Sequence, residues 1–427
     1  MRISKESILR DAAYLRMWLA ITVSSFGSSI TTVGLGLLAA TRLDATPVEM
    51  GLLGAAFTTP FVVLGPLIGV YADRMRRRRI LVAADLFRAA VLAAMPLLLW
   101  FDWLDMNLLY VVAVCLGIGD AWFDVAYGSY LPTVVGRERL IEAHSKLQVS
   151  QSAAEVAGPG ISGLIIQTLG IQVGVLIDAA SFVFSALFIR SIRNEEPTPA
   201  APAAADVPSV WRDLKAGVAF LFGHPLLRAL TIRLAIWQFA SSGVLAMLML
   251  FVTVRMKFGA AQIGLLFSAI GVGVFVGANV AQRVSARLGV GRTIALANLG
   301  GAAALLAVPL SSDAPVGQLA ALGAALFAYG FCQINYYINN ASLRQAITPD
   351  GMLGRMGAGS RTVALAMHGL GAAATGLLAE QIGLRQALLL LGAAALLLAT
   401  AGYVHRSLQA TVTLPARAEL DVEGGVQ

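Results

Sequence analysis

Long apolar blocks recur along almost the whole sequence, and this feature constrains the fold more than any other. A helix needs about 20 apolar residues to cross a bilayer core that is about 30 Å thick. The chain contains blocks of that length from end to end, so we predict an all-α integral membrane protein with twelve transmembrane helices. The predicted spans are 17–41, 48–71, 80–101, 106–131, 148–169, 171–190, 226–254, 260–282, 291–311, 315–340, 358–380 and 383–404.

The composition agrees with a membrane protein and argues against two other classes. Hydrophobic residues make up 58% of the chain and charged residues only 13%, whereas soluble domains have about 25% charged residues. The net charge of +7 lies in short loops between spans and not on a soluble face, so we do not expect nucleic acid as a partner. The two cysteines are isolated within apolar blocks, and we expect no metal and no cofactor.

The distribution of Lys and Arg over alternate loops predicts the orientation. One side of the membrane holds nearly all of these residues, including the run of arginines at 74–79. The opposite side would hold only Arg42, Arg255, Lys257 and Arg385. Cytoplasmic loops carry an excess of positive residues, so we expect both termini in the cytoplasm and the protein in the cell (inner) membrane.

The sequence also repeats itself. Similar segments begin at Glu49 and Gln262, at Arg74 and Arg287, and at Ser162 and Thr375, each pair 213 residues apart (262 − 49, 287 − 74, 375 − 162). Parallel repeats of six helices are a transporter architecture. The predicted domains are an N-terminal six-helix bundle (1–191), a cytoplasmic linker with an amphipathic helix (192–225), a C-terminal six-helix bundle (226–406) and a disordered tail (407–427).

Two motifs resemble a known family. The segment "GVYADRMRRRR", which starts at residue 69, resembles the signature of the major facilitator superfamily between its second and third helices, although Arg76 replaces a usual glycine. The matching residues are Gly69, Asp73, Arg74, Arg77 and Arg78. The segment "EVAGPGISG" resembles the motif in helix 5 of export-type members, through Gly158, Pro159 and Gly163. Several phrases are similar to the branch that holds enterobactin exporters and macrolide-efflux proteins.

The resemblance implies a carrier in which two six-helix bundles open a central site alternately to each side. It also implies that Asp73 holds the cytoplasmic side closed through the start of helix 11. A purely topological role for the arginine cluster remains the alternative. Many proton antiporters of the superfamily carry an arginine in helix 4, and the span at 106–131 has none. The usual proton relay is therefore not transferred to this chain.

Charged residues inside the spans are the candidates for coupling, because each costs about 2.5–3.5 kcal/mol at the centre of a helix. We expect a charge network near the cytoplasmic side of the cavity, made of Arg88, Asp120, Asp124, Glu155 and Arg233. Asp120 and Asp124 share a helix face, so they could hold a proton or bind a cationic group of a substrate. The alternative is a static set of ion pairs that only fixes the packing of the helices.

Neutral polar residues are expected to line the substrate cavity. These are Gln238, Asn335, Asn339 and Tyr336. Such a lining suits a bulky amphipathic solute, and we predict proton-coupled efflux of a drug, antibiotic or siderophore by a monomer. Uptake or symport of a metabolite and movement of lysophospholipids are alternatives. A membrane enzyme or a non-transporting receptor is a third possibility, but the sequence has no catalytic or sensor motif that would favour it.

Overall fold

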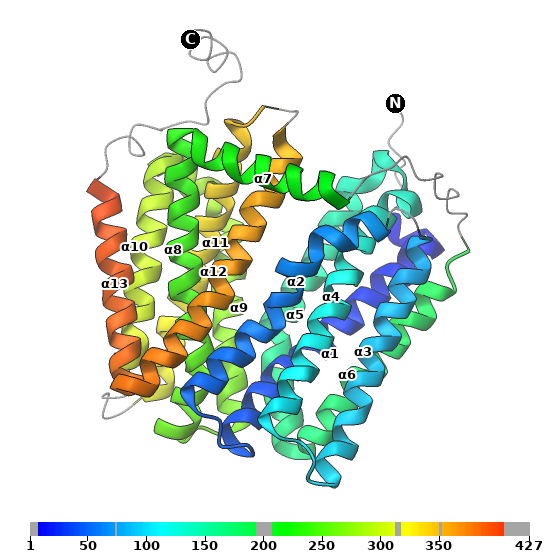
Figure 1. The fold of residues 1–427 in the computed structure, drawn as a ribbon, viewed down its shortest axis with the longest axis horizontal. Coiled ribbons are helices and arrows are strands. Elements are labelled where there is room, and N and C mark those ends of the chain that lie inside the picture. Colours follow the sequence, from blue (N-terminus) through cyan, green and yellow to red (C-terminus); the bar gives the residue numbers. More distant parts are fainter. Residues whose placement is uncertain (1–6, 73–74, 194–206, 312–316, 350–351, 405–427) are drawn as a thin grey trace. The chain divides into compact units, whose positions relative to one another are not determined.

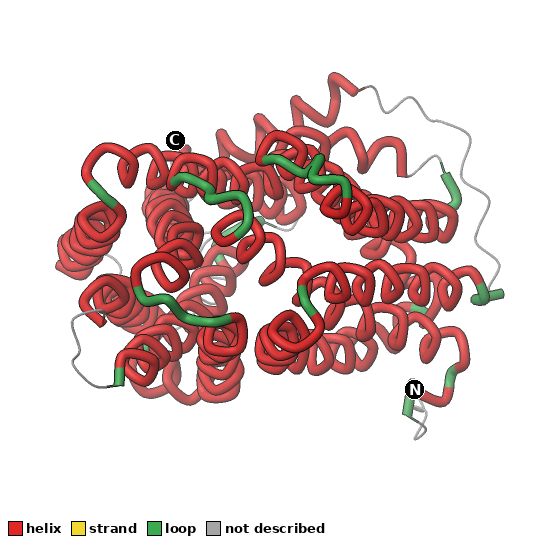
Figure 2. The backbone as a smooth tube through the Cα atoms, turned by 90° about the horizontal axis from the view of Figure 1, so that it is seen from below, coloured by secondary structure: helices red, strands yellow, loops and turns green. Residues whose placement is uncertain are grey.

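The computed structural model describes residues 7–72, 75–193, 207–311, 317–349 and 352–404, and within these ranges the chain folds into helices without a strand (Figures 1 and 2). In chain order the helices are α1 (Ala12–Thr41), α2 (Pro47–Ala72), α3 (Arg77–Trp100), α4 (Met106–Val135), α5 (Leu140–Leu169), α6 (Ile171–Arg190), α7 (Val207–Gly223), α8 (Pro225–Leu250), α9 (Ala260–Leu288), α10 (Val290–Leu310), α11 (Gln318–Ala346), α12 (Leu353–Ile382) and α13 (Leu384–Val404). The predicted all-α fold is confirmed.

Several helices begin or end beyond the apolar blocks from which the spans were predicted. Helix α1 begins at Ala12 because the carboxylate of Asp11 caps it, accepting hydrogen bonds from the N–H groups of Ala13 (2.8 Å) and Tyr14 (3.2 Å). Helix α5 begins at Leu140 and not at residue 148. A pattern of apolar residues cannot locate such ends, because polar turns continue a helix without adding to its apolar block.

Eleven of the described helices are long and apolar enough to cross a membrane. Helix α5 has 30 residues, as many as α1, but its first half carries Glu142, His144 and Lys146 and is too polar to meet the same test. It packs along α1 and α6, and we count it as the twelfth spanning helix. Helix α7 is shorter and amphipathic, as predicted for the segment after the linker.

The chain divides into two compact units, and their boundaries differ from those of a simple N-terminal and C-terminal half. Unit 1 consists of Met1–Ala45, Ala56–Trp211 and Gly259–Gly264, and unit 2 consists of Thr46–Ala55, Arg212–Phe258 and Leu265–Gln427. The first turns of α9 thus group with unit 1, and the first turns of α2 with unit 2. The predicted domain limits stay predictions, and the predicted tail at 407–427 lies outside the described residues.

Unit 1 is built around α1, α3 and α6, which pack on one another, with α5 along α1 and α4 along α3. Its core includes Tyr14, Leu81, Tyr130 and Leu147, all 2% exposed or less. The hydroxyl of Tyr14 donates a 2.8 Å hydrogen bond to the carbonyl oxygen of Ala143, which joins the first turns of α1 and α5. The polar start of α5 is therefore held against the core of this unit.

Unit 2 is built from two helix pairs, α8 with α12 and α10 with α11, together with α13 on α10. Trp237 of α8 is 2% exposed and stacks on Tyr329 and Tyr336 of α11, with ring centroids 5.8 Å and 5.6 Å apart. A Cβ at Gly301 of α10 would lie 2.3 Å from the Trp237 ring. The indole therefore fills space that only a glycine leaves open.

The internal repeat reappears as one helix crossing found twice, once within each unit. In unit 1, a Cβ at Gly163 of α5 would lie 2.3 Å from the carbonyl oxygen of Ala260, at the start of α9. In unit 2, a Cβ at Gly376 of α12 would lie 2.4 Å from the carbonyl oxygen of Pro47, at the start of α2. Gly376 and Ala260 each lie 213 residues from the counterpart in the other crossing (376 − 163, 260 − 47), the offset found in the sequence.

The ends of α5 and α12 repeat in the same way. Gly170 follows α5 with a φ of 83°, and Gly383 follows α12 with a φ of 90°. Residues with a side chain rarely adopt these left-handed conformations, so glycine is the natural residue at both positions. The two glycines are again 213 residues apart (383 − 170).

Candidate functional site

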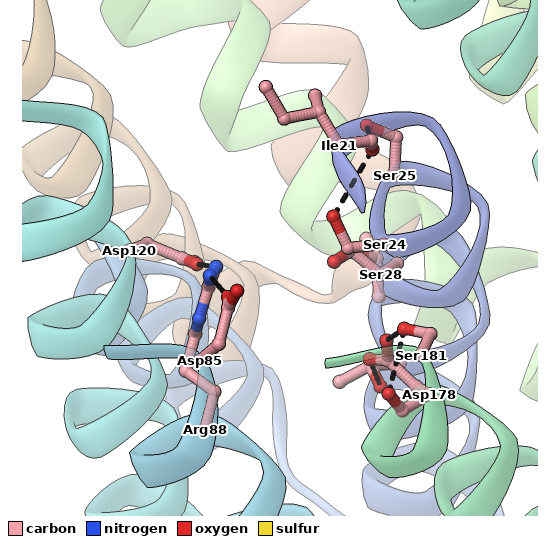
Figure 3. Close-up of polar contacts among 11 residues, drawn as sticks. Ile21, Ser24, Ser25, Ser28, Asp85, Arg88, Asp120, Asp178 and Ser181 are labelled. Atoms are coloured by element: carbon pink, nitrogen blue, oxygen red, sulfur yellow. Dashed lines mark hydrogen bonds and ion pairs between the residues drawn. The ribbon is translucent and has the colours of Figure 1, made fainter. Parts of the chain in front are cut away.

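An arginine bridges two carboxylates within unit 1 (Figure 3). Nη1 of Arg88 lies 2.5 Å from Oδ1 of Asp120, and Nη2 makes an ion pair with Oδ1 of Asp85. Asp85 precedes Arg88 by one turn of α3, and Asp120 lies near the middle of α4. The pairing of α3 with α4 thus assembles the site, which we call the Arg88 bridge (Asp85, Arg88 and Asp120).

The two carboxylates of the Arg88 bridge differ in exposure. The side chain of Asp85 is 0% exposed and that of Asp120 is 56% exposed, while Arg88 itself is 7% exposed. Its guanidinium carbon also lies 4.1 Å from the ring centroid of Phe182 and 4.7 Å from that of Phe123. Aromatic faces attract cations within about 6 Å, so the two rings help to hold a guanidinium that has little contact with solvent.

Part of this arrangement was missed by the sequence analysis. The committed network contained Arg88 and Asp120 but omitted Asp85, which the structure brings into direct contact with Arg88. The spacing of Asp85 and Arg88, three residues apart on one helix, was the signal that could have found the pair. The two aromatic rings had no comparable signal, because Phe182 comes from α6, far away in the sequence.

The other predicted members of the charge network lie elsewhere. Asp124 is exposed one turn beyond Asp120 on the same face of α4, as its spacing implies. Glu155 of α5 is exposed, and Arg233 of α8 is half-buried in unit 2. The structure therefore brings Arg88 and Asp120 together, and a role for the remaining three residues stays a prediction.

A second buried carboxylate lies between α1 and α6 (Figure 3). Asp178 is 1% exposed and accepts hydrogen bonds from the hydroxyls of Thr31 and, at 2.9 Å, Ser181. A Cβ at Gly27 would lie 2.4 Å from Oδ1 of Asp178, so the glycine allows α1 to approach. Because hydroxyl groups satisfy both carboxylate oxygens, this cluster fits the structural role that the sequence suggests for Asp178.

Two of the arginines in the motif at 69–78 tie helix ends together. Arg77 donates through Nη1 to the carbonyl oxygen of Ser129 in α4 (3.2 Å), and Arg78 donates to that of Ile192, just after α6. Both bonds lie within unit 1 and fix the start of α3. Gly69 lies in the last turn of α2, whereas Asp73 and Arg74 lie outside the described residues.

The motif in α5 lies at two close helix contacts. A Cβ at Gly158 would lie 2.4 Å from the hydroxyl oxygen of Ser29 in α1. The carbonyl oxygen of Pro159 lies where a Cβ of Gly264 would be, 2.4 Å away, and Gly163 forms the crossing with Ala260 described above. The three motif residues therefore act at least in packing, and an additional role in export stays a prediction.

The residues predicted to line a substrate cavity lie in the interior of unit 2. Gln238 accepts a hydrogen bond from the hydroxyl of Tyr337, and Asn339 accepts one from Ser285 of α9 (2.6 Å). Asn335 donates to the carbonyl oxygen of Phe331 (2.8 Å), and Tyr336 is fully buried against Trp237. These contacts join α8, α9 and α11, and contact with a substrate stays a prediction for all four.

No group of three His, Cys, Asp or Glu side chains could hold a metal ion within the described residues. The groups that the structure assembles are instead an arginine shared by two acids and a separate buried acid. Such a set can bind and release a proton and can exchange one ion pair for another. Its chemistry is therefore that of charge movement and not of bond cleavage.

The sequence was compared with known proteins once this geometry was established. Residues 3–422 match a family described as transmembrane secretion effectors, within the major facilitator superfamily. The multidrug efflux pump Tap of Mycolicibacterium fortuitum is 30% identical over 229 residues, which are 52% of this chain and 55% of Tap. The enterobactin exporter EntS of Escherichia coli O1:K1 is 26% identical over 373 residues, 83% of each protein. The matched stretch spans about half the length of some of the first relatives.

Solved structures share the fold. A bacterial homologue of the iron transporter ferroportin, in an inward-facing state, has a TM-score of 0.72 and 16% sequence identity. The alignment covers 95% of this chain and 100% of the homologue. At this level of identity the similarity extends to the fold alone.

Proposed function

The chain belongs to the major facilitator superfamily, and from this premise we propose that it exports a bulky amphipathic small molecule in exchange for protons. It is a multi-pass membrane transporter and not an enzyme. Two of its relatives are named as exporters, one of several drugs and one of enterobactin. These names support the outward direction of transport and a large substrate such as a drug, an antibiotic or a siderophore.

The Arg88 bridge carries the proposal of proton coupling. Arg88 is the shared partner of one carboxylate that is exposed and one that is fully buried. A proton that arrives from water reaches Asp120 first, because that carboxylate is 56% exposed. Once Asp120 is protonated it no longer attracts the guanidinium as an ion, and Asp85 is left as the only charged partner of Arg88.

This change converts a proton into a rearrangement of α3 against α4. With Asp120 ionised, the guanidinium is held from both helices, since Asp85 and Arg88 lie on α3 and Asp120 on α4. With Asp120 neutral, the electrostatic tie between the helices is lost and only the contact within α3 remains. Two states of one ion pair are what a proton-driven carrier needs in order to favour different conformations. We further propose that Asp124, Glu155 and Arg233 belong to the same coupling set.

The remaining parts of the proposal follow from the sequence and the family. The protein would lie in the inner membrane with both termini in the cytoplasm, because Lys and Arg are concentrated on one side. Gln238, Asn335, Asn339 and Tyr336 would contact the substrate in one state of the cycle. The motif from Gly69 to Arg78 would hold the cytoplasmic side closed, and the protein would act as a monomer.

The proposal is tested by accumulation assays in cells that lack their own efflux pumps. Cells that express the protein are loaded with a macrolide, a fluorescent organic cation or a catecholate, and retention is followed with and without an uncoupler. Export predicts lower retention of at least one compound, and the uncoupler should restore it. Higher retention in expressing cells would instead support uptake or symport, and would contradict the proposed direction.

A further inference from the structure

A groove between α3 and α4 forms on the side of these helices that the Arg88 bridge does not use. Its volume is about 530 Å³, within the range of about 300–1,000 Å³ that is usual for sites of small ligands. Ile80, Ala83 and Phe87 line it from α3, and Ile118 and Trp122 line it from α4. Among the described residues that line the groove, Arg79 is the only charged one.

The groove lies along a surface that is exposed and apolar. Phe87 is 42% exposed and Met75, at the mouth of the groove, is 49% exposed, and Leu86 beside it is 47% exposed. Large apolar side chains that remain exposed on a spanning helix face hydrocarbon and not water. From Arg79 to Phe87 the groove follows α3 for about 12 Å, so a lipid chain that enters beside Arg79 reaches well into the bilayer.

The four consecutive arginines before and at the start of α3 fall into two pairs. Arg77 and Arg78 point to carbonyl oxygens of other segments, as described above. Arg76 and Arg79 are exposed, and within the described part of the chain neither side chain has a hydrogen-bond or ion-pair partner. They are three residues apart, so they project from the same side of the helix start.

We propose that the groove and these two arginines form a binding site for an anionic phospholipid. Arg76 and Arg79 hold the phosphate, and one acyl chain lies between α3 and α4. Guanidinium groups bind phosphate oxygens through paired hydrogen bonds, and the start of a helix favours an anion. Basic groups beside a crevice between spanning helices are typical of sites for anionic head groups. The inference is independent of the transported substrate and uses the proposed orientation only to assign the lipid to the cytoplasmic leaflet.

Native mass spectrometry of the purified full-length protein tests the site. The protein is titrated with dioleoyl phosphatidylglycerol or with dioleoyl phosphatidylethanolamine, which carries no net charge. We expect retained phosphatidylglycerol at concentrations where phosphatidylethanolamine is lost. The double variant Arg76→Gln/Arg79→Gln should bind phosphatidylglycerol roughly thirtyfold more weakly, because two cationic contacts are removed.

The matched control removes equal charge from a different place. Arg190→Gln/Arg193→Gln takes two exposed arginines with the same spacing from the end of α6, and we expect it to bind like the wild type. Equal loss in both double variants would show a general effect of surface charge and would overturn the site. Equal retention of the two lipids by the wild type would overturn its preference for an anionic head group.

A second pair of variants tests the groove without touching the arginines. Ala83 is exposed within the groove, so Ala83→Trp fills it, whereas Leu86→Trp adds the same ring to the exposed face beside it. We expect only Ala83→Trp to weaken retention of phosphatidylglycerol. If both variants bind like the wild type, the acyl chain does not lie in the groove and the proposal is wrong. Thermal unfolding of each variant separates loss of the lipid from loss of the fold.

Discussion

Nη1 of Arg88 on α3 lies 2.5 Å from Oδ1 of Asp120 on α4, and this contact joins a buried cation to an exposed acid. The same guanidinium is paired with Asp85, which is fully buried. One residue therefore connects a carboxylate that water reaches with one that it does not. This asymmetry distinguishes the site from a simple surface ion pair, which contributes little to stability and has no directional role.

Removal of Arg88 should destabilise the protein because Asp85 would be left charged and buried. Loss of one partner of a buried ion pair costs about 3–5 kcal/mol, and we expect Arg88→Gln to lower the midpoint of thermal unfolding in detergent. Arg88→Gln/Asp85→Asn should recover most of the loss, since the buried charge is then absent. A double variant no more stable than Arg88→Gln would contradict the pairing of Asp85 with Arg88.

The repeated crossing predicts equal sensitivity at two glycines in different units. Gly163→Ala and Gly376→Ala each place a methyl group within 2.4 Å of a backbone carbonyl oxygen, so the helices must separate. We expect both variants to unfold at lower temperature than the wild type and to lose transport. Gly128→Ala is the matched control, because nothing lies within 4 Å of a Cβ at that position of α4.

In the control, alanine should be tolerated or should stabilise α4, since glycine within a helix costs about 0.5–1 kcal/mol relative to alanine. The informative result is the comparison of the two crossings. If Gly163→Ala destabilises and Gly376→Ala does not, the two contacts are not equivalent, and the repeat does not extend to the packing of these helices.

The helical membrane fold and its repeat could be predicted from the sequence because they depend on local patterns. Apolar blocks define spans, and the offset of 213 that related Ser162 to Thr375 also relates Gly163 to Gly376 in the structure. The polar start of α5 could not be predicted in this way, because it is held by a tertiary contact of Tyr14 with Ala143. A hydropathy pattern carries no information on such a contact.

The candidate site could be predicted only in part, for a related reason. The cost of burying a charge singles out Arg88 and Asp120 in the sequence, but the choice of partner depends on helix rotation. Rotation brings Asp85, Phe123 and Phe182 around the guanidinium. It also buries Tyr336 against Trp237, although the sequence alone places this tyrosine on a polar face with Asn335 and Asn339.

Asp178 should respond differently from the acids of the Arg88 bridge. Its carboxylate accepts hydrogen bonds from the hydroxyls of Thr31 and Ser181, and an asparagine could keep these contacts because a hydroxyl both donates and accepts. We expect Asp178→Asn to retain transport driven by a pH gradient. Asp178→Leu should destabilise the protein, because Thr31 and Ser181 would lose their partner. Loss of coupling with an intact fold in Asp178→Asn would assign the proton to this carboxylate instead.

The exposed position of Asp120 allows a substitution with little effect on folding. Surface substitutions usually change stability by less than about 0.5 kcal/mol, and the side chain of Asp120 is 56% exposed. We expect Asp120→Asn to reach the membrane at the level of the wild type and to unfold at a similar temperature. A large fall in stability would mean that the contact with Arg88 serves packing and not coupling.

The most direct test of the account compares two transport modes of Asp120→Asn in proteoliposomes, with the exported compound that the accumulation assays identify. Transport driven by an imposed pH gradient is measured beside exchange of labelled for unlabelled compound without a gradient. Glu380→Gln, which removes an exposed acid of α12, is the control and should behave like the wild type in both. The account predicts that Asp120→Asn keeps exchange but loses transport driven by the gradient. Gradient-driven transport at the wild-type rate in Asp120→Asn would contradict it.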